Sequence, residues 1–545
     1  MDSLTLPNQA GPAPRSTGQR DLASHAARSL RRADPELDTL LEREFRRQND
    51  TLALVAYASL ADPSVLACGA SVLANVTAEG YPGARYHPGC QWLDEVEQLA
   101  IRRTQAAFKA RYVNVQPHSC SSANLSVLFA LLRPGDTVLG LSLDAGGHLT
   151  HGSAASVVGD YFTAVGYGVN KSGFIDYGQV RELAHRHRPK VLIAGASAYP
   201  RALDFERFRS VADEVGAYLV ADISHIAGLV AAGVHSSPVD LAHITTLSTY
   251  KQLGGPRGGL ILSGVECDTP GPDGTCTLAQ LMQRAVFPRS QGTLHATGIA
   301  AKARALALVG RPEFRELAER IRRDARALAA SLLRRGHRVL TGGTDTHMVV
   351  VDTTAFGLSG AAAESALEDC GILANRNRIP HDTRSARVTS GLRFGTNIIA
   401  QRGFEPEDMD ECAALVHQVL TAAEPLGRTA HRLDPEVRDR VRHSVRGLCA
   451  RRPIPGYAVD PAALRPGRDA RATGPSPGCG ICALRPGRTR LRCCCCRTAE
   501  AAPIPSSTGP HISPTTSEFS PLSTRGGAPV SGSRRHRAWT SCGAR

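Results

Sequence analysis

The chain has 545 residues, enough for a large buried core and for two to four domains, and its formal net charge is +14. Residues 451–545 contain fifteen arginines, no lysine and four acidic residues, so they carry +11 and leave only +3 for the preceding residues. Net charge therefore gives no argument that the main part of the chain binds nucleic acid.

Targeting signals are not evident in the sequence. The N-terminal stretch has no apolar segment behind a basic start, and no run of about eighteen apolar residues is long enough to cross a membrane. The fifteen cysteines are therefore expected to be reduced thiols in the cytoplasm.

The N-terminal third begins with residues 1–33, which are rich in Gly, Pro, Ser and Arg and are predicted to be a disordered leader. Helices are expected at Pro35–Asn49, where the charges suit the helix dipole, and at Glu97–Phe108. The segment NVQPHSCSSAN is a serine-rich turn that opens a helix, where backbone amides can bind phosphate. Ser119 and Ser121 are the candidates, and plain helix capping explains these serines equally well.

Alternating strands and helices dominate the middle of the chain. Helical stretches such as Phe205–Val215 separate strand-like runs at Thr137–Leu143, Lys190–Ala196, Ala217–Ala221, His243–Thr249 and Gly259–Leu262. The alternation predicts an α/β fold in which helices cover both faces of a mostly parallel sheet. Residues 34–300 are assigned to an N-terminal helix and this large domain.

The pattern changes after about residue 300. Apolar residues at helical spacing from Phe314 to Leu332 predict a long amphipathic helix. A strand at Met348–Asp352, helices near Ala361 and Asp408, and a strand within TSGLRFGT follow. Residues 301–456 are therefore expected to form a smaller α+β domain.

The C-terminal tail, residues 457–545, is rich in Pro, Gly, Ala, Arg and Ser and is predicted to be a disordered, low-complexity segment. Cys479, Cys482 and the run Cys493–Cys496 suggest zinc, but four adjacent cysteines cannot all reach one tetrahedral ion and no histidine lies at ligand spacing. No metal site is expected.

Two polar residues end buried strand-like runs between Val220 and Leu262. Asp222 and Lys251 each stand where open α/β sheets place their ligand sites. Lys251 is one of only five lysines among 64 basic residues, which indicates that its amine is required, because arginine cannot lose its proton. An aspartate upstream suits the ring nitrogen of pyridoxal phosphate (PLP). A buried ion pair is the alternative.

Several ordered blocks resemble serine hydroxymethyltransferase from about Glu42 to Pro453: AEGYPGARY, NVQPHSCSSAN, GDTVLGLSLDAGGHLTHGS, the Val220–Leu262 stretch, and TSGLRFGT followed by RGF. The resemblance implies a PLP-dependent transferase of fold type I with a seven-stranded sheet. It also implies small amino acid and aldehyde substrates, a homodimer or homotetramer with shared active sites, and neither nucleic-acid nor membrane partners.

The resemblance assigns roles to individual residues. Lys251 would bind PLP covalently, and Asp222 would keep its ring nitrogen protonated. The other cofactor-binding residues would be His148 stacked on the ring, Ser197 and His225 at its 3-oxygen, and Ser119, Cys120, Ser121, Ser248 and Tyr250. Arg393 would clamp the substrate carboxylate, with Tyr57, Tyr86 and His87 also binding substrate. Glu79, from a neighbouring subunit, would move the proton of the β-hydroxyl, so that Lys251, Glu79, His148 and Tyr57 form the catalytic set. Without the resemblance, the sequence would indicate that His225 is a structural histidine and that Glu79 is an exposed turn residue.

Departures from the family cluster near the substrate. Where hydroxymethyltransferases have Leu-Ile-Ala-Ser-Glu-Asn, this chain has Leu54-Val55-Ala56-Tyr57-Ala58-Ser59. Thr77 and His87 each replace a tyrosine, Tyr250 replaces a histidine, and Pro288–Thr293 replaces Pro-Gly-Gly-Gln-Gly-Gly. The cofactor residues are kept while the substrate's surroundings are rebuilt.

This combination favours a threonine transaldolase of specialised metabolism, such as antibiotic biosynthesis, resembling fluorothreonine transaldolase. Such enzymes cleave L-threonine to acetaldehyde and add the glycyl carbanion to another aldehyde, for example fluoroacetaldehyde to give 4-fluorothreonine. Two alternatives remain open. One is a serine hydroxymethyltransferase that uses tetrahydrofolate, favoured by Asn377 at a folate-like position, and the other is an inactive scaffold paralogue.

Overall fold

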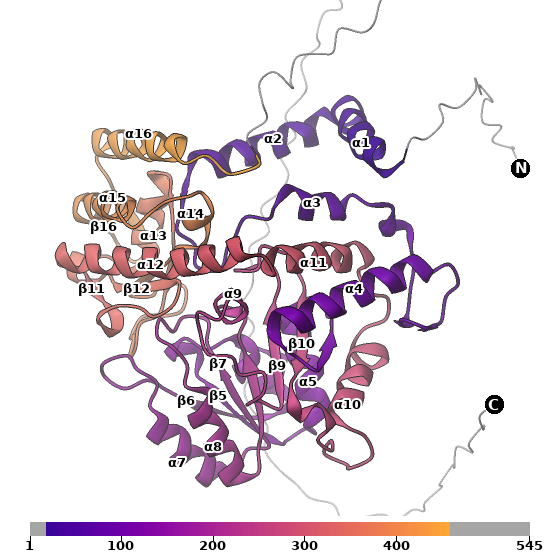
Figure 1. Cartoon of the computed structure of the whole chain (residues 1–545). Helices are drawn as coiled ribbons and strands as arrows, with labels where there is room; N and C mark the ends of the chain where they lie inside the picture. Colours follow the sequence, from indigo (N-terminus) through magenta and orange to yellow (C-terminus); the bar gives the residue numbers. More distant parts are fainter. Residues whose placement is uncertain (1–17, 458–545) are drawn as a thin grey trace, which may run out of the picture. The chain divides into compact units, whose positions relative to one another are not determined.

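The computed structural model describes residues 18–457, which lie in one compact unit (Figure 1). The predicted tail falls outside the described residues apart from Tyr457, as does the leader up to residue 17. Within the predicted leader, however, residues Gln19–Ala33 form helix α1 in place of disorder. Its Ala, Leu and Arg residues are strong helix formers, and they outweigh the polar composition.

A seven-stranded sheet forms the centre of the large domain. Its order is β4 (Tyr112–Asn114), β10 (Gly259–Ser263), β9 (Ile244–Ser248), β8 (Tyr218–Asp222), β7 (Val191–Gly195), β5 (Thr137–Leu141) and β6 (Thr163–Tyr167). Strand β10 is antiparallel to both its neighbours, and the pairs from β9 to β6 are all parallel. The α/β prediction with a mostly parallel seven-stranded sheet is confirmed.

Alternate residues of the central strands point into two separate hydrophobic cores. In β7 and β8, Leu192 and Leu219 join one core, whereas Ile193 and Val220 join the other. The first core is covered by α4 (Gln91–Phe108), α7 (Tyr177–His187), α8 (Phe205–Val215) and α11 (Ala296–Val309), and the second by α5 (Cys120–Leu131) and α10 (Leu278–Arg284). Burial on both faces explains why these strands read as continuous apolar runs.

The small domain has its own core around an antiparallel sheet. Its strand order is β11 (Arg338–Val339), β12 (Met348–Asp352), β15 (Gly391–Gly395) and β14 (Asn375–Asn377), covered by α12 (Pro312–Arg334), α13 (Gly360–Asp369), α15 (Asp408–Ala422) and α16 (Pro435–Arg451) (Figure 1). The predicted strands and helices of this region are all present.

The N-terminal segment packs with the small domain, although the sequence groups it with the large one. After α2 (Pro35–Asp50), strand β1 (Leu52–Ala53) pairs in parallel with β13 (Ile372–Leu373), and Leu52 and Leu54 enter the small-domain core. A pairing across more than three hundred residues leaves no local sequence signal. The segment after β1 therefore starts from the small domain and carries Tyr57 towards the domain boundary.

The remaining regular elements are short: α3 (Pro63–Gly69), β2 (Gly80–Tyr81), β3 (Ala84–Arg85), α6 (Val157–Tyr161), α9 (Ala227–Ala231), α14 (Asn397–Gln401), β16 (Glu424–Leu426) and β17 (Ala430–Arg432). Over residues 18–457, none of the helices combines the length and the apolar character that a membrane crossing requires.

Candidate active site

A cavity of about 240 Å³ opens at the carboxyl ends of β7, β8 and β9. Its lining consists of His118, Ser119, Cys120, Ser121, His148, Ala196, Ser197, Asp222, Ser224, His225, Ser248, Tyr250, Lys251, Arg257 and Gly258. All ten residues predicted to bind the cofactor are among them. The three strands place Ser197, Asp222 and Lys251 at one edge because parallel strands end on the same side of a sheet.

Asp222 is buried and fully hydrogen-bonded. Its Oδ2 accepts from Asn124 Nδ2 at 2.8 Å and lies 3.1 Å from His151 Nε2, while Oδ1 accepts from the backbone N–H of Ser224 at 3.0 Å. Burial alone would raise the pKa of this carboxyl, but the hydrogen bond from His151 holds the pKa well below its usual value. Asp222 is therefore a carboxylate at neutral pH.

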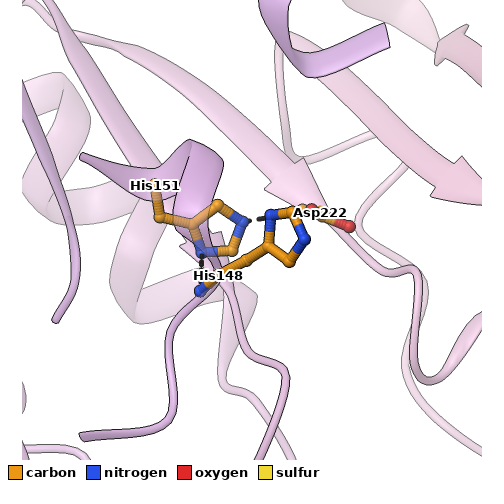
Figure 2. Close-up of side chains that lie close together, drawn as sticks. All are labelled: His148, His151 and Asp222. Atoms are coloured by element: carbon orange, nitrogen blue, oxygen red, sulfur yellow. Dashed lines mark hydrogen bonds and ion pairs between the residues drawn. The ribbon is translucent and has the colours of Figure 1, made fainter. Parts of the chain in front are cut away.

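His148, His151 and Asp222 form a compact cluster whose side-chain ligand atoms lie within 4.8 Å of one another (Figure 2). Two histidines and a carboxylate suit zinc by residue type. However, His151 Nδ1 accepts the backbone N–H of His148 at 3.3 Å, so the ring proton is on Nε2 and is donated to Asp222. Both nitrogens of His151 are thereby engaged, which favours a hydrogen-bond relay over a metal site.

His148 itself lines the cavity as a neutral ring. Its Nδ1 accepts the backbone N–H of Thr150 at 3.2 Å and lies 2.8 Å from the Thr150 hydroxyl. Burial lowers the pKa of His148 to about 4. The imidazole is therefore uncharged and is held in a defined orientation.

Lys251 stands three residues after the end of β9 and is only 7% exposed. Burial lowers its pKa to about 8, against the opposing influence of Asp222. Such an amine reaches its unprotonated, nucleophilic form far more readily than a surface lysine. The neighbouring Tyr250 ring lies 5.9 Å from the Lys251 nitrogen and 4.5 Å from the guanidinium carbon of Arg257.

The N-terminus of α5 forms another wall of the cavity. The Ser119 hydroxyl caps the helix by accepting the backbone N–H of Ser122 at 3.0 Å, so the capping alternative holds for this residue. Capping leaves the first amides of the helix, and the exposed Ser121, facing the cavity as anion donors. Burial raises the pKa of Cys120, whose sulfur accepts from the Ser224 hydroxyl at 2.9 Å, so it is a neutral thiol.

Arg393 reaches the cavity from β15 of the small domain. Its guanidinium donates to the backbone oxygen of Ser197 and, through Nε, to Asn375 Oδ1 at 3.1 Å. The ring of Tyr57 lies 5.5 Å from the guanidinium carbon. Burial lowers the pKa of Arg393 to about 10, so the side chain stays charged at neutral pH. A buried cation beside the cavity suits a carboxylate ligand.

Glu79, Tyr86 and His87 do not line this cavity within one chain. Glu79 lies beside Gly292, and Tyr86 is 76% exposed with its ring against Phe287 at 5.6 Å. The structure thus brings Tyr57 to Arg393 but leaves the exposed Tyr86 and the half-buried Glu79 and His87 outside the cavity of their own chain.

Several further residues build the site and were not predicted from the sequence. His118, Ser224, Arg257 and Gly258 line the cavity, and Asn124 and His151 hold Asp222. Most stand in quoted motifs, since His151 lies three residues after His148 and Arg257 lies within GGPRGG. The ring of His347 stacks on that of His225, with 5.8 Å between the ring centroids, and no sequence motif around His347 indicates this contact.

The chemistry of the cavity fits PLP. A buried carboxylate suits the ring nitrogen, a buried amine suits the aldehyde, and a helix N-terminus with hydroxyls suits the phosphate. In addition, the buried Nδ1 of His225 has no hydrogen-bond partner among residues 18–457, and His225 lines the cavity. A buried polar atom without a partner in such a cavity calls for a ligand atom.

Comparisons with known proteins agree with this site. The family described as serine hydroxymethyltransferase matches residues 30–416. The serine hydroxymethyltransferase of Alkalilimnicola ehrlichii is 46% identical over 422 residues, which cover 77% of this chain and 96% of that protein. That of Zymomonas mobilis is 46% identical over 436 residues, covering 80% and 99%. The chain therefore belongs to the serine hydroxymethyltransferase family and is a PLP-dependent transferase.

Proposed function

We propose that the protein breaks and forms the Cα–Cβ bond of a β-hydroxy amino acid. The observation that carries the proposal is the meeting of Lys251, Asp222 and Arg393 around one cavity, since Arg393 binds beside Ser197, which lines it. When bound there, PLP supplies an electron sink for the substrate's Cα.

Each side chain has a defined task in this proposal. Arg393 would hold the substrate carboxylate, Asp222 would pair with the ring nitrogen of PLP, and Lys251 would hold the cofactor through its amine. The neutral His148 lines the cavity and would face the ring without adding charge. Glu79 and Tyr86 act in the cavity of a second subunit of a homodimer or homotetramer, which accounts for their distance from their own chain's cavity.

The comparisons favour transfer of a hydroxymethyl group between serine and glycine with tetrahydrofolate, because both relatives are named for this activity and align over nearly their full length. We take this reaction, in the cytoplasm, as the first candidate. The threonine transaldolase interpretation from the sequence does not receive the same support.

One observation keeps the transaldolase as a second candidate. The Tyr57 ring sits over Arg393, at a place where the family motif has a serine, and Ala58 follows where the motif has a glutamate. A ring there narrows the approach to the substrate's carboxylate side. It suits an enzyme that shields a reactive carbon until a second aldehyde arrives.

Two parallel assays decide between the candidates. Purified protein is given L-serine with tetrahydrofolate, or L-threonine with a panel of aldehydes and no folate, and products are identified by mass. Turnover of serine at roughly 1 per second or more, with no new β-hydroxy amino acid from threonine, establishes the hydroxymethyltransferase. The opposite outcome establishes the transaldolase. Failure of both reactions in PLP-loaded protein refutes the proposal and leaves the scaffold alternative.

A further inference from the structure

Lys302 is a buried lysine that lies outside the cavity lining described above. It projects from α11, is 3% exposed, and donates three hydrogen bonds to backbone oxygens: to Val115 at 2.6 Å, to Pro117 at 3.0 Å and to Gly259 at 3.1 Å. Burial lowers the pKa of Lys302 to about 7, while the three surrounding oxygens favour keeping its proton. Of the five lysines, only Lys251 and Lys302 are buried.

The three backbone oxygens lie where the end of β4 meets the start of β10. The ladder between β4 and β10 ends at the pair Asn114–Ile261, and beyond it the Gly259 amide donates to Pro117 O at 3.0 Å. A tetrahedral ammonium can serve three converging acceptors at once, which the planar guanidinium of arginine cannot do with the same geometry. Lys302 therefore ties the end of β4 to the start of β10.

Both tied segments lead directly into the cavity. The first continues from Pro117 to His118, Ser119 and the N-terminus of α5, and the second follows Arg257 and Gly258. The backbone around Gly258 and Gly259 is tightly packed. A Cβ at Gly259 would overlap the backbone oxygen of Ser119 and lie 3.0 Å from the Cys120 nitrogen, and a Cβ at Gly258 would lie 2.9 Å from the Lys302 nitrogen.

We propose that Lys302 is a positioning residue for the phosphate of PLP: it holds the strand ends so that the α5 N-terminus and the Gly258 turn keep the spacing that the phosphate requires. It acts through backbone atoms, without touching the cofactor. The inference rests on PLP binding and is independent of which aldol reaction the enzyme performs.

The test compares PLP with pyridoxal, which has the same ring and aldehyde but no phosphate. Lys302→Met keeps an unbranched side chain, one atom shorter than lysine, and removes all three donors. Leu306→Ala is the matched control, because Leu306 lies one turn further along α11, is likewise 3% exposed, and belongs to the hydrophobic core. Dissociation constants come from absorbance titration of apoprotein, and thermal unfolding of each apoprotein is recorded alongside.

Relative to the control, Lys302→Met should raise the dissociation constant of PLP about tenfold or more, equivalent to about 1.4 kcal/mol, and change that of pyridoxal by less than about twofold. Equal weakening of both ligands would mean that Lys302 only stabilises the fold, and an unchanged PLP constant would also overturn the proposal. Should Lys302→Met not fold, Gly258→Ala decides, because its Cβ displaces the same amine. Selective loss of PLP affinity supports the proposal, and wild-type PLP affinity overturns it.

Discussion

Replacing Asp222 with asparagine changes one charge at the centre of the site and almost nothing in shape. The carboxylate receives three N–H groups, two on Oδ2 from Asn124 and His151 and one on Oδ1 from the Ser224 backbone. An asparagine can place its oxygen where Oδ2 was, and its NH2 then faces the Ser224 N–H. One buried donor is left without an acceptor, which costs about 1–3 kcal/mol in stability of the apoprotein.

The effect on catalysis adds to this cost. In the proposed role, Asp222 would accept a charged hydrogen bond from the protonated PLP ring nitrogen, and such a bond is worth about 1.5–3 kcal/mol, so its loss should lower kcat by about 10-fold to 150-fold. The assay is steady-state turnover at saturating PLP, with urea unfolding of the apoprotein as the stability measurement. Ser224→Ala is the control, since it removes a hydroxyl from the same cavity and keeps the backbone donor to Asp222. If Asp222→Asn turned over within about twofold of the wild type, the assigned role of the carboxylate would be refuted.

Three further predictions follow from the site and the small domain. Lys251→Ala should abolish turnover because no other described amine lines the cavity, and wild-type turnover in that variant would contradict the covalent role. Tyr57→Ser removes a ring–guanidinium contact with Arg393 worth about 0.5–2 kcal/mol, so the ratio of hydroxymethyl transfer to transaldol activity should change by about 2-fold to 30-fold, whereas Tyr57→Phe keeps the ring and the ratio. Asp324 is fully buried in α12 with both carboxylate oxygens unpaired among residues 18–457, and burial raises its pKa to about 8 from a value of about 4 in the unfolded chain. The contribution of Asp324 to the free energy of unfolding is therefore complete below about pH 4 and is lost as pH rises to about 8. Asp324→Asn should raise the free energy of unfolding by about 1–3 kcal/mol at pH 8 and by much less at pH 5. An equal increase at both pH values, measured by urea unfolding, would contradict this prediction.

Much of the large domain follows from local sequence. Strands buried on both faces read as apolar runs, so β5, β7, β8, β9 and β10 were predictable to within two residues. Strand β4 has three residues and β6 has largely exposed ones, and neither produces such a run. The polar residues that end β8 and β9 marked Asp222 and Lys251 as ligand candidates, because chemistry at strand ends is a property of the topology.

The sequence by itself predicted the fold class and marked Lys251 and Asp222 as ligand candidates, since each of these predictions depends on apolar runs and on the polar residues that follow them. Only the tertiary structure decided that His151 and Asn124 hold Asp222, that Tyr57 covers Arg393, and that Lys302 joins two strand ends that lie 187 and 43 residues away from it in the chain. Such contacts join segments far apart in the chain, and the sequence around one partner does not indicate which residue it will contact. Their geometry exists only once the two cores have brought those segments together.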